Sequence, residues 1–280
     1  MLFLYKFLTL EKEKMEKFIE TIFVLVVFIV TTSIFVDYVR NFRKLTDDYK
    51  KHALFFIVTF LLFNISNLTM LFGNMKLKFP MIITIILFYS LVIWLLVMTG
   101  KYYCNNIGIS DMPIINSFVN KIKINENYFS KKHLKYIIFT VVINIIYSAF
   151  LFHIFPSKQS VLVTETDQIL FNKLPEGLLF VVTYILGQFL IALIEELSYR
   201  LCLQNFIASK FNLKGNKYIA AILLTSIIFA LSHFQQTNLP LVKILQTLPI
   251  GIGLGFIFKN YGIESCILTH WLFNLVTYFI

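Results

Sequence analysis

Long apolar runs constrain the fold of this chain more than any other feature of its sequence. A transmembrane helix needs roughly 20 mostly apolar residues, and about eight runs in the chain approach that length. The stretches between these runs carry most of the charged side chains. The sequence therefore predicts an all-α fold, a polytopic membrane helix bundle of about eight transmembrane helices. The predicted spans cover residues 18–36, 53–72, 80–99, 134–155, 178–194, 218–234, 241–258 and 263–280.

The composition supports a membrane location and argues against a nucleic-acid partner. Of the 280 residues, 58% are hydrophobic and 14% are charged, whereas soluble domains average about 25% charged residues. This is more apolar surface than one core can bury, so we expect the lipid bilayer as a partner. The net charge of +10 clusters in the loops between the apolar runs, as is typical of loops near anionic lipid. The sequence shows no basic and aromatic face suited to nucleic acid.

The loops indicate how the chain is organised. The longest, residues 101–133, is polar and basic and separates three apolar runs from five. We therefore predict a variable N-terminal transmembrane region with its basic loop over residues 1–133, and a functional core over residues 134–280. Lys and Arg are more numerous in the loops after the first, third, fifth and seventh runs, which predicts that these loops are cytoplasmic.

Ionisable residues inside a membrane are costly and usually functional, and here they concentrate towards the C-terminus. They occur in three groups, IEELSYR, FALSH and HWLFN, each within or beside an apolar run. Glu196 and Arg200 share a helix face at i, i+4 and can form an ion pair that neutralises both charges. Glu195 points about 100° away from Glu196 on an ideal helix. It is therefore free to face another helix.

The other two groups can reach the same pocket as Glu195. His270 and Asn274 lie four residues apart and share a helix face, and His233 ends the sixth run as Glu195 ends the fifth. Such a set suits hydrolysis. A carboxylate in an apolar pocket can act as a general base on water, one His can hold that water, and the second His and the Asn can donate to an oxyanion. Alternatively, Glu195, His233 and His270 could bind a divalent metal such as zinc, although the HExxH motif is absent.

These three groups resemble the ordered motifs EExxxR, FxxxH and HxxxN of the CPBP family, which comprises CAAX proteases and bacteriocin-processing enzymes and is also called the Abi family. The resemblance covers residues 178–280, and every motif position is filled. It implies a hydrolase, an intramembrane endopeptidase that acts on a peptide or membrane-protein substrate. If the roles of the matching motif positions in the family hold here, Glu195 activates the water, His233 positions it, and His270 and Asn274 form the oxyanion site.

The resemblance also implies supporting roles and leaves the cofactor open. Glu196 and Arg200 would support the catalytic residues, and Phe229 would pack beside them. Members of the family are commonly labelled metalloproteases, yet a metal-free, glutamate-dependent mechanism fits the eukaryotic relatives. Richness in Ile, Lys, Phe and Asn is typical of a low-GC bacterial genome. We therefore expect a bacterial cell membrane and a bacteriocin precursor, a signal-peptide precursor or another small membrane protein as substrate.

Other interpretations of the same residues remain open. His270 and Asn274 could serve as interhelical hydrogen-bonding groups, and Cys104, Cys202 and Cys266 are interpreted as packing residues. The small residues between Pro249 and Gly255 favour close helix packing over a substrate groove. The whole chain could instead be a non-catalytic bacteriocin-immunity or regulatory scaffold, or a transporter. A transporter would be expected to show inverted repeats, and the sequence shows none.

Overall fold

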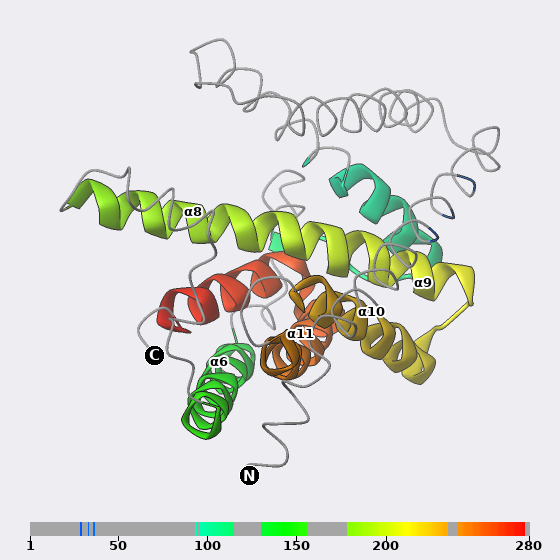
Figure 1. Ribbon diagram of the computed structural model, residues 1–280. Helices are drawn as coiled ribbons and strands as arrows, with labels where there is room; N and C mark the ends of the chain where they lie inside the picture. The colour runs from blue at the N-terminus through cyan, green and yellow to red at the C-terminus, as the bar shows by residue number, and fades with distance from the viewer. Residues whose placement is uncertain are drawn as a thin grey trace, which may run out of the picture.

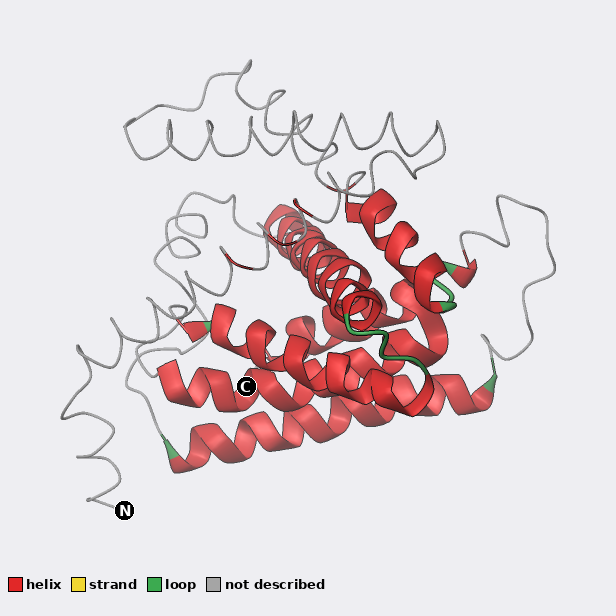
Figure 2. Cartoon of the chain, turned by 90° about the vertical axis from the view of Figure 1, so that its right-hand side faces the viewer, coloured by secondary structure: helices red, strands yellow, loops and turns green. Residues whose placement is uncertain are grey.

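The computed structural model describes residues 29, 33, 36, 93, 96–114, 130–155, 178–234 and 240–277. This part of the chain is built from helices and short connections and contains no strand (Figure 2). Residues 96–107 form one helix. The remaining helices, in chain order, are α6 (Lys131–Ile154), α8 (Leu178–Glu196), η3 (Leu197–Gln204), α9 (Asn205–Lys210), η4 (Gly215–Lys217), α10 (Tyr218–Ser232) and α11 (Pro240–Thr277).

The helical class is confirmed for the described residues. These residues cover only some of the predicted spans. Three helical segments are long and apolar enough to cross a membrane: Lys131–Ile154, Gly215–Ser232 and Leu241–Thr277. They coincide with the fourth, sixth, seventh and eighth predicted runs. The first three runs lie outside the described residues, apart from residues 29, 33, 36, 93 and 96–99. The total of eight spans therefore stays a prediction.

The fifth predicted run differs from the structure at its C-terminal end. We expected the span to end at residue 194, but the helical chain continues through η3 and α9 to Lys210. The reason is that the polar residues beyond the run are buried among protein groups, including Arg200, Gln204 and Asn205. Residues 197–204 form a π-helix, a wide helical form that is rare and often found at functional sites. Glu195 consequently lies within a long helix and not at its end.

Helix α11 lies at the centre of the described bundle, where it contacts α6, α8, α10 and η3 (Figure 1). It consists of two helices joined at Gly262, whose backbone angles are φ 80° and ψ −179°. A side chain here would collide with the ring of Pro113. The N–H of Ile263 donates to the carbonyl of Asp111 over 3.0 Å, so the segment before α6 stabilises the break.

Glycines in the first half of α11 allow neighbouring helices to approach closely. A Cβ atom on Gly253 would lie 2.7 Å from Cγ2 of Thr140 in α6. A Cβ atom on Gly255 would lie 2.6 Å from Cγ2 of Ile222 in α10 and 3.1 Å from Oε1 of Gln204 in η3. Small residues at helix interfaces are the usual means of close packing in membranes. The prediction that this segment serves packing is confirmed.

Replacing Gly255 by Ala should therefore lower the stability of the bundle. The added methyl group would collide with the β-branched Ile222 side chain, and overpacking of this kind costs about 1–3 kcal/mol. Gly187→Ala in α8 is the matched control, because nothing lies within 4 Å of its Cβ position. Thermal unfolding of the purified protein in detergent measures both. Equal melting temperatures for the two variants would contradict this account of the packing.

Candidate active site

The carboxylate of Glu195 lies between two imidazole rings that come from two other helices. Glu195 Oε1 is 3.7 Å from His233 Nε2, and Glu195 Oε2 is 3.6 Å from His270 Nε2. Glu195 belongs to α8, His233 is the C-terminal cap of α10, and His270 lies in the second half of α11. The two rings are almost buried, whereas the Glu195 side chain retains 22% exposure. Three helices thus bring these groups to one place that remains open on one side.

The adjacent carboxylate, Glu196, is fully buried and has three polar partners. Its Oε2 atom is 3.3 Å from Nε of Arg200 and accepts a hydrogen bond from the thiol of Cys266 over 2.8 Å. Its Oε1 atom is 2.7 Å from Nδ1 of His270. The ion pair between Glu196 and Arg200 that the i, i+4 spacing predicts is therefore present. Because His270 contacts both carboxylates through different ring nitrogens, it connects Glu195 to this buried group.

Arg200 is a fully buried cation that helices α10 and α11 surround. Its Nη2 atom donates to the carbonyl of Gly251 over 3.2 Å, and its guanidinium carbon lies 4.1 Å from the centre of the Phe229 ring. Phe229 also contacts the rings of His233 and His270, with centroids 4.5 Å and 5.9 Å apart. The ring of Phe229 therefore contacts the paired cation and both imidazoles.

The backbone of α10 fixes the orientation of His233. Its Nδ1 atom lies 2.7 Å from the carbonyl oxygen of Phe229, one helical turn earlier. A carbonyl oxygen can only accept, so Nδ1 carries the proton. In the neutral ring, Nε2 then has a free lone pair, and this is the atom that faces Glu195. His233 can therefore accept a hydrogen bond from a molecule placed between the ring and the carboxylate.

Asn274 lies one turn beyond His270 on the same helix. Its backbone carbonyl accepts hydrogen bonds from Tyr184 Oη over 3.4 Å and from Thr277 Oγ1 over 3.2 Å. Within the described part of the chain, its side-chain amide has no hydrogen bond to Glu195 or to either imidazole. The structure thus brings together Glu195 and the two His, whereas Asn274, one turn beyond His270, makes no described side-chain hydrogen bond to them.

Sequence reasoning missed two residues near the site. Cys266 was expected to be a packing residue, but its thiol donates to Glu196; its position four residues before His270 on one helix is the signal that could have revealed it. Lys243 lies in the first turn of α11 and interacts electrostatically with Glu195 and His233. Its ammonium group donates to Oε1 of Gln246 over 3.2 Å. A lysine inside an apolar run was itself a signal of function.

The structure gives no support for the alternative of a bound metal ion. Among the residues that the structure describes, no group of three or more His, Cys, Asp or Glu side chains has the arrangement of a metal site. The Nδ1 atoms of His233 and His270 are engaged by Phe229 and Glu196. Their Nε2 atoms approach different oxygens of Glu195. We therefore assign no step of the chemistry to a metal at these residues.

Removal of the buried cation should reduce the amount of folded protein. Arg200→Met leaves the carboxylate of Glu196 buried without its ionic partner, and breaking a buried pair in this way costs about 3–5 kcal/mol. Lys101→Met is the control, since Lys101 pairs with Asp111 over 3.9 Å and is 36% exposed, where a pair contributes about 0–1 kcal/mol. Protein abundance in membranes and thermal unfolding in detergent compare the two. Similar losses of abundance and melting temperature in the two variants would show that the buried Glu196–Arg200 pair contributes no more to stability than the exposed Lys101–Asp111 pair.

The thiol of Cys266 should stabilise the protein more than the other buried thiols. Cys266→Ala removes a donor to a buried carboxylate, and leaving such a group short of a partner costs about 1–3 kcal/mol. Cys202→Ala is the matched control, because the Cys202 thiol donates to the neutral carbonyl of Leu96 over 2.9 Å. Cys266→Ser keeps a donor and should recover much of the loss. A melting temperature for Cys266→Ala no lower than that for Cys202→Ala would contradict this role.

Comparison with known proteins identifies the region that carries the site. Residues 177–276 match the family model described as Type II CAAX prenyl endopeptidase Rce1-like. The matched segment begins at the start of α8 and includes all three motif groups. No curated protein matches the chain, and no solved structure does. Residues 177–276, which carry all three motif groups, are therefore similar to the Rce1-like type II CAAX prenyl endopeptidases.

Proposed function

We propose that this protein is an intramembrane endopeptidase in which Glu195 activates a water molecule that hydrolyses a peptide bond. One observation carries the proposal: the Glu195 carboxylate lies 3.7 Å and 3.6 Å from two imidazole nitrogens supplied by two other helices. A carboxylate beside two imidazoles is the kind of group that general acid–base catalysis requires. The family match of residues 177–276 supports a protease activity for this segment.

The separation between Glu195 and His233 suits a bridging water. At 3.7 Å, Oε1 and Nε2 are too far apart for a direct hydrogen bond, but one water can bridge them. Glu195 and Nε2 of His233 would each accept a hydrogen bond from that water. Its oxygen lone pair would then point away from both groups, towards a substrate carbonyl. Glu195 would remove the proton as the carbon–oxygen bond forms and would later pass a proton to the leaving amine.

His270 is suited to the opposite task, stabilisation of the oxyanion. Its Nδ1 atom donates to Glu196, so Nε2 can donate towards an oxyanion only when the ring is an imidazolium. An imidazolium here, together with Arg200, would balance the charges of Glu195 and Glu196. A preorganised donor of this kind typically contributes a factor of about 10²–10³ in rate. We assign Asn274 the role of a second donor, which would require its side chain to turn towards the substrate.

The position of the site between apolar helices favours a substrate that is itself in or at the membrane. Three segments of the described chain are apolar enough to span a bilayer. His233 directly follows one of them and His270 lies within another, and both face the partly exposed Glu195. We propose a membrane-associated protein or peptide precursor as substrate, such as a bacteriocin precursor or a signal-peptide precursor in a bacterial cell membrane. The rival function is a non-catalytic immunity or regulatory scaffold with the same fold.

Glu195→Gln should abolish proteolysis and leave the protein folded. The amide keeps the shape of the carboxylate but cannot take a proton from water, and loss of a general base typically lowers the rate by about 10²–10⁴. Glu264→Gln is the control, because that side chain accepts a backbone hydrogen bond from Ile114 over 2.9 Å, which an amide oxygen can also accept. Both variants should accumulate in membranes to the level of the wild type.

The measurement compares membrane and secreted peptides from a deletion strain with those from strains that carry the wild type, Glu195→Gln or Glu264→Gln. We expect a peptide product with the wild type and with Glu264→Gln, and none with Glu195→Gln at equal protein level. The product would also identify the substrate. A Glu195→Gln strain that restores every phenotype, with no peptide differing among the strains, would refute the protease proposal and favour the scaffold.

A further inference from the structure

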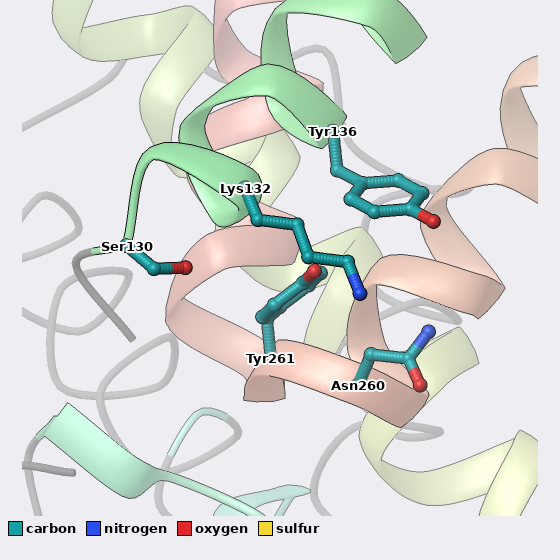
Figure 3. Close-up of a pocket in the computed structure, with 5 residues that line it drawn as sticks. All are labelled: Ser130, Lys132, Tyr136, Asn260 and Tyr261. Carbon is teal, nitrogen blue, oxygen red and sulfur yellow. The ribbon is translucent and has the colours of Figure 1, made fainter. Parts of the chain in front are cut away.

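A polar pocket lies between the N-terminal turn of α6 and the residues of α11 that precede its break. Its volume is about 390 Å³, within the range of about 300–1,000 Å³ that small-molecule sites occupy. The pocket is lined by Ser130, Lys132, Tyr136, Asn260 and Tyr261 (Figure 3). In this view the Lys132 side chain extends between Tyr136 and Asn260, and Tyr261 lies beneath it. None of these residues belongs to the candidate active site.

The described residues of the lining offer hydrogen-bond donors and one positive charge, and none of them is acidic. The Lys132 ammonium has three donors, and Tyr136, Tyr261 and Ser130 each have a hydroxyl proton to donate. Ser130 Oγ accepts the N–H of His133 over 3.2 Å and so caps α6, which leaves its proton for another partner. Asn260 uses one amide proton on the carbonyl of Phe256 over 3.0 Å and retains the other. Such a lining fits an anion with several acceptor oxygens.

The surrounding charges favour the same kind of ligand. Lys131 and Lys135 are exposed on the first turns of α6, and the α-helix of 24 residues adds positive partial charge at its N-terminus. Lys259 precedes Asn260 and donates to the carbonyl of Gly215 over 3.2 Å. This contact brings the connection between α9 and α10, which carries Lys214 and Lys217, to the same end of the bundle.

Among the described residues, the two carboxylates near this end of the bundle are engaged by other groups. Glu264 accepts the N–H of Ile114 over 2.9 Å. Asp111 lies 3.9 Å from the ammonium group of Lys101. Neither carboxylate lines the pocket. The positive charge of Lys132 is therefore available to a ligand.

An exposed apolar stripe on α6 begins at the pocket. It starts with Tyr136 and continues at intervals of three and four residues, so its members share one helix face. The stripe consists of Tyr136, Phe139, Ile143, Ile146 and Phe150, all of which are exposed. Because α6 is a candidate membrane span, this face is suited to acyl chains, and the pocket lies where a headgroup would be. A ligand with a phosphate and acyl chains would contact both features.

We propose that this pocket binds the phosphate headgroup of an anionic membrane phospholipid, whose acyl chains lie along the exposed face of α6. Basic pockets between transmembrane helices are known to bind such headgroups. The loops that form this end of the bundle are those predicted to be cytoplasmic, and the cytoplasmic leaflet is the one that carries negative surface charge. The site is independent of the proposed protease activity, since it shares no residue with it.

Native mass spectrometry of the full-length protein in detergent tests the proposal. The probes are phosphatidylglycerol and phosphatidylcholine with identical acyl chains, each titrated against wild type, Lys132→Gln and Lys131→Gln. Lys131 is the matched control, since it is exposed on the same turn but does not line the pocket. We expect the wild type to prefer phosphatidylglycerol. Lys132→Gln should weaken its binding about fivefold, whereas Lys131→Gln should change it little.

Three outcomes would overturn the proposal. Equal binding of the two lipids by the wild type would remove the headgroup preference. Equal losses for Lys132→Gln and Lys131→Gln would assign the effect to general surface charge. Displacement of phosphatidylglycerol by inorganic phosphate would assign the pocket to a soluble anion. Melting temperatures measured for the three proteins would ensure that the comparison concerns binding, and a Tyr136→Phe variant, which lacks one donor, should show a smaller loss than Lys132→Gln.

Discussion

The fully buried carboxylate of Glu196 is the group on which the rest of the site depends. A charge in this position is tolerated only when it is paired and hydrogen-bonded, and Glu196 obtains its partners from three directions. Arg200 lies one turn along its own helix, whereas Cys266 and His270 come from α11. The need to satisfy this one group therefore draws α8, η3 and α11 together. In doing so it sets the orientation of His270, whose second nitrogen faces Glu195.

A second polar network performs a similar task further along the helix. Gln204 donates to the hydroxyl of Tyr218 over 2.9 Å, and that hydroxyl donates to Oδ1 of Asn205 over 2.7 Å. The Asn205 amide in turn donates to the thiol of Cys104 over 3.1 Å. These contacts join η3, α9, α10 and the helix of residues 96–107. Since lipid offers no hydrogen bonds, each such group fixes one neighbour more definitely than apolar packing would.

The sequence predicts the elements of the site well because charged residues in apolar runs are few and their helical spacing is informative. The i, i+4 pairing of Glu196 with Arg200 and the different direction of Glu195 follow from helix geometry alone. The continuation of the helix to Lys210 does not, because hydropathy treats Arg200 and Gln204 as loop residues unless their partners are known. The partners of Gln204 lie 14 and 51 residues away in the chain, and Arg200 also donates to Gly251, 51 residues away. No local pattern covers such separations.

The length of the π-helix η3 restricts where related chains can gain or lose residues. In this segment the side chain of Asn205 donates to the carbonyls of Arg200 and Leu201, over 3.1 Å and 2.7 Å. Removal of a single residue between Glu196 and Asn205 would rotate everything that follows relative to the carboxylates. The contact with Tyr218 would then be lost. An alignment of functional homologues should accordingly contain no gap in this interval, even where the individual side chains differ.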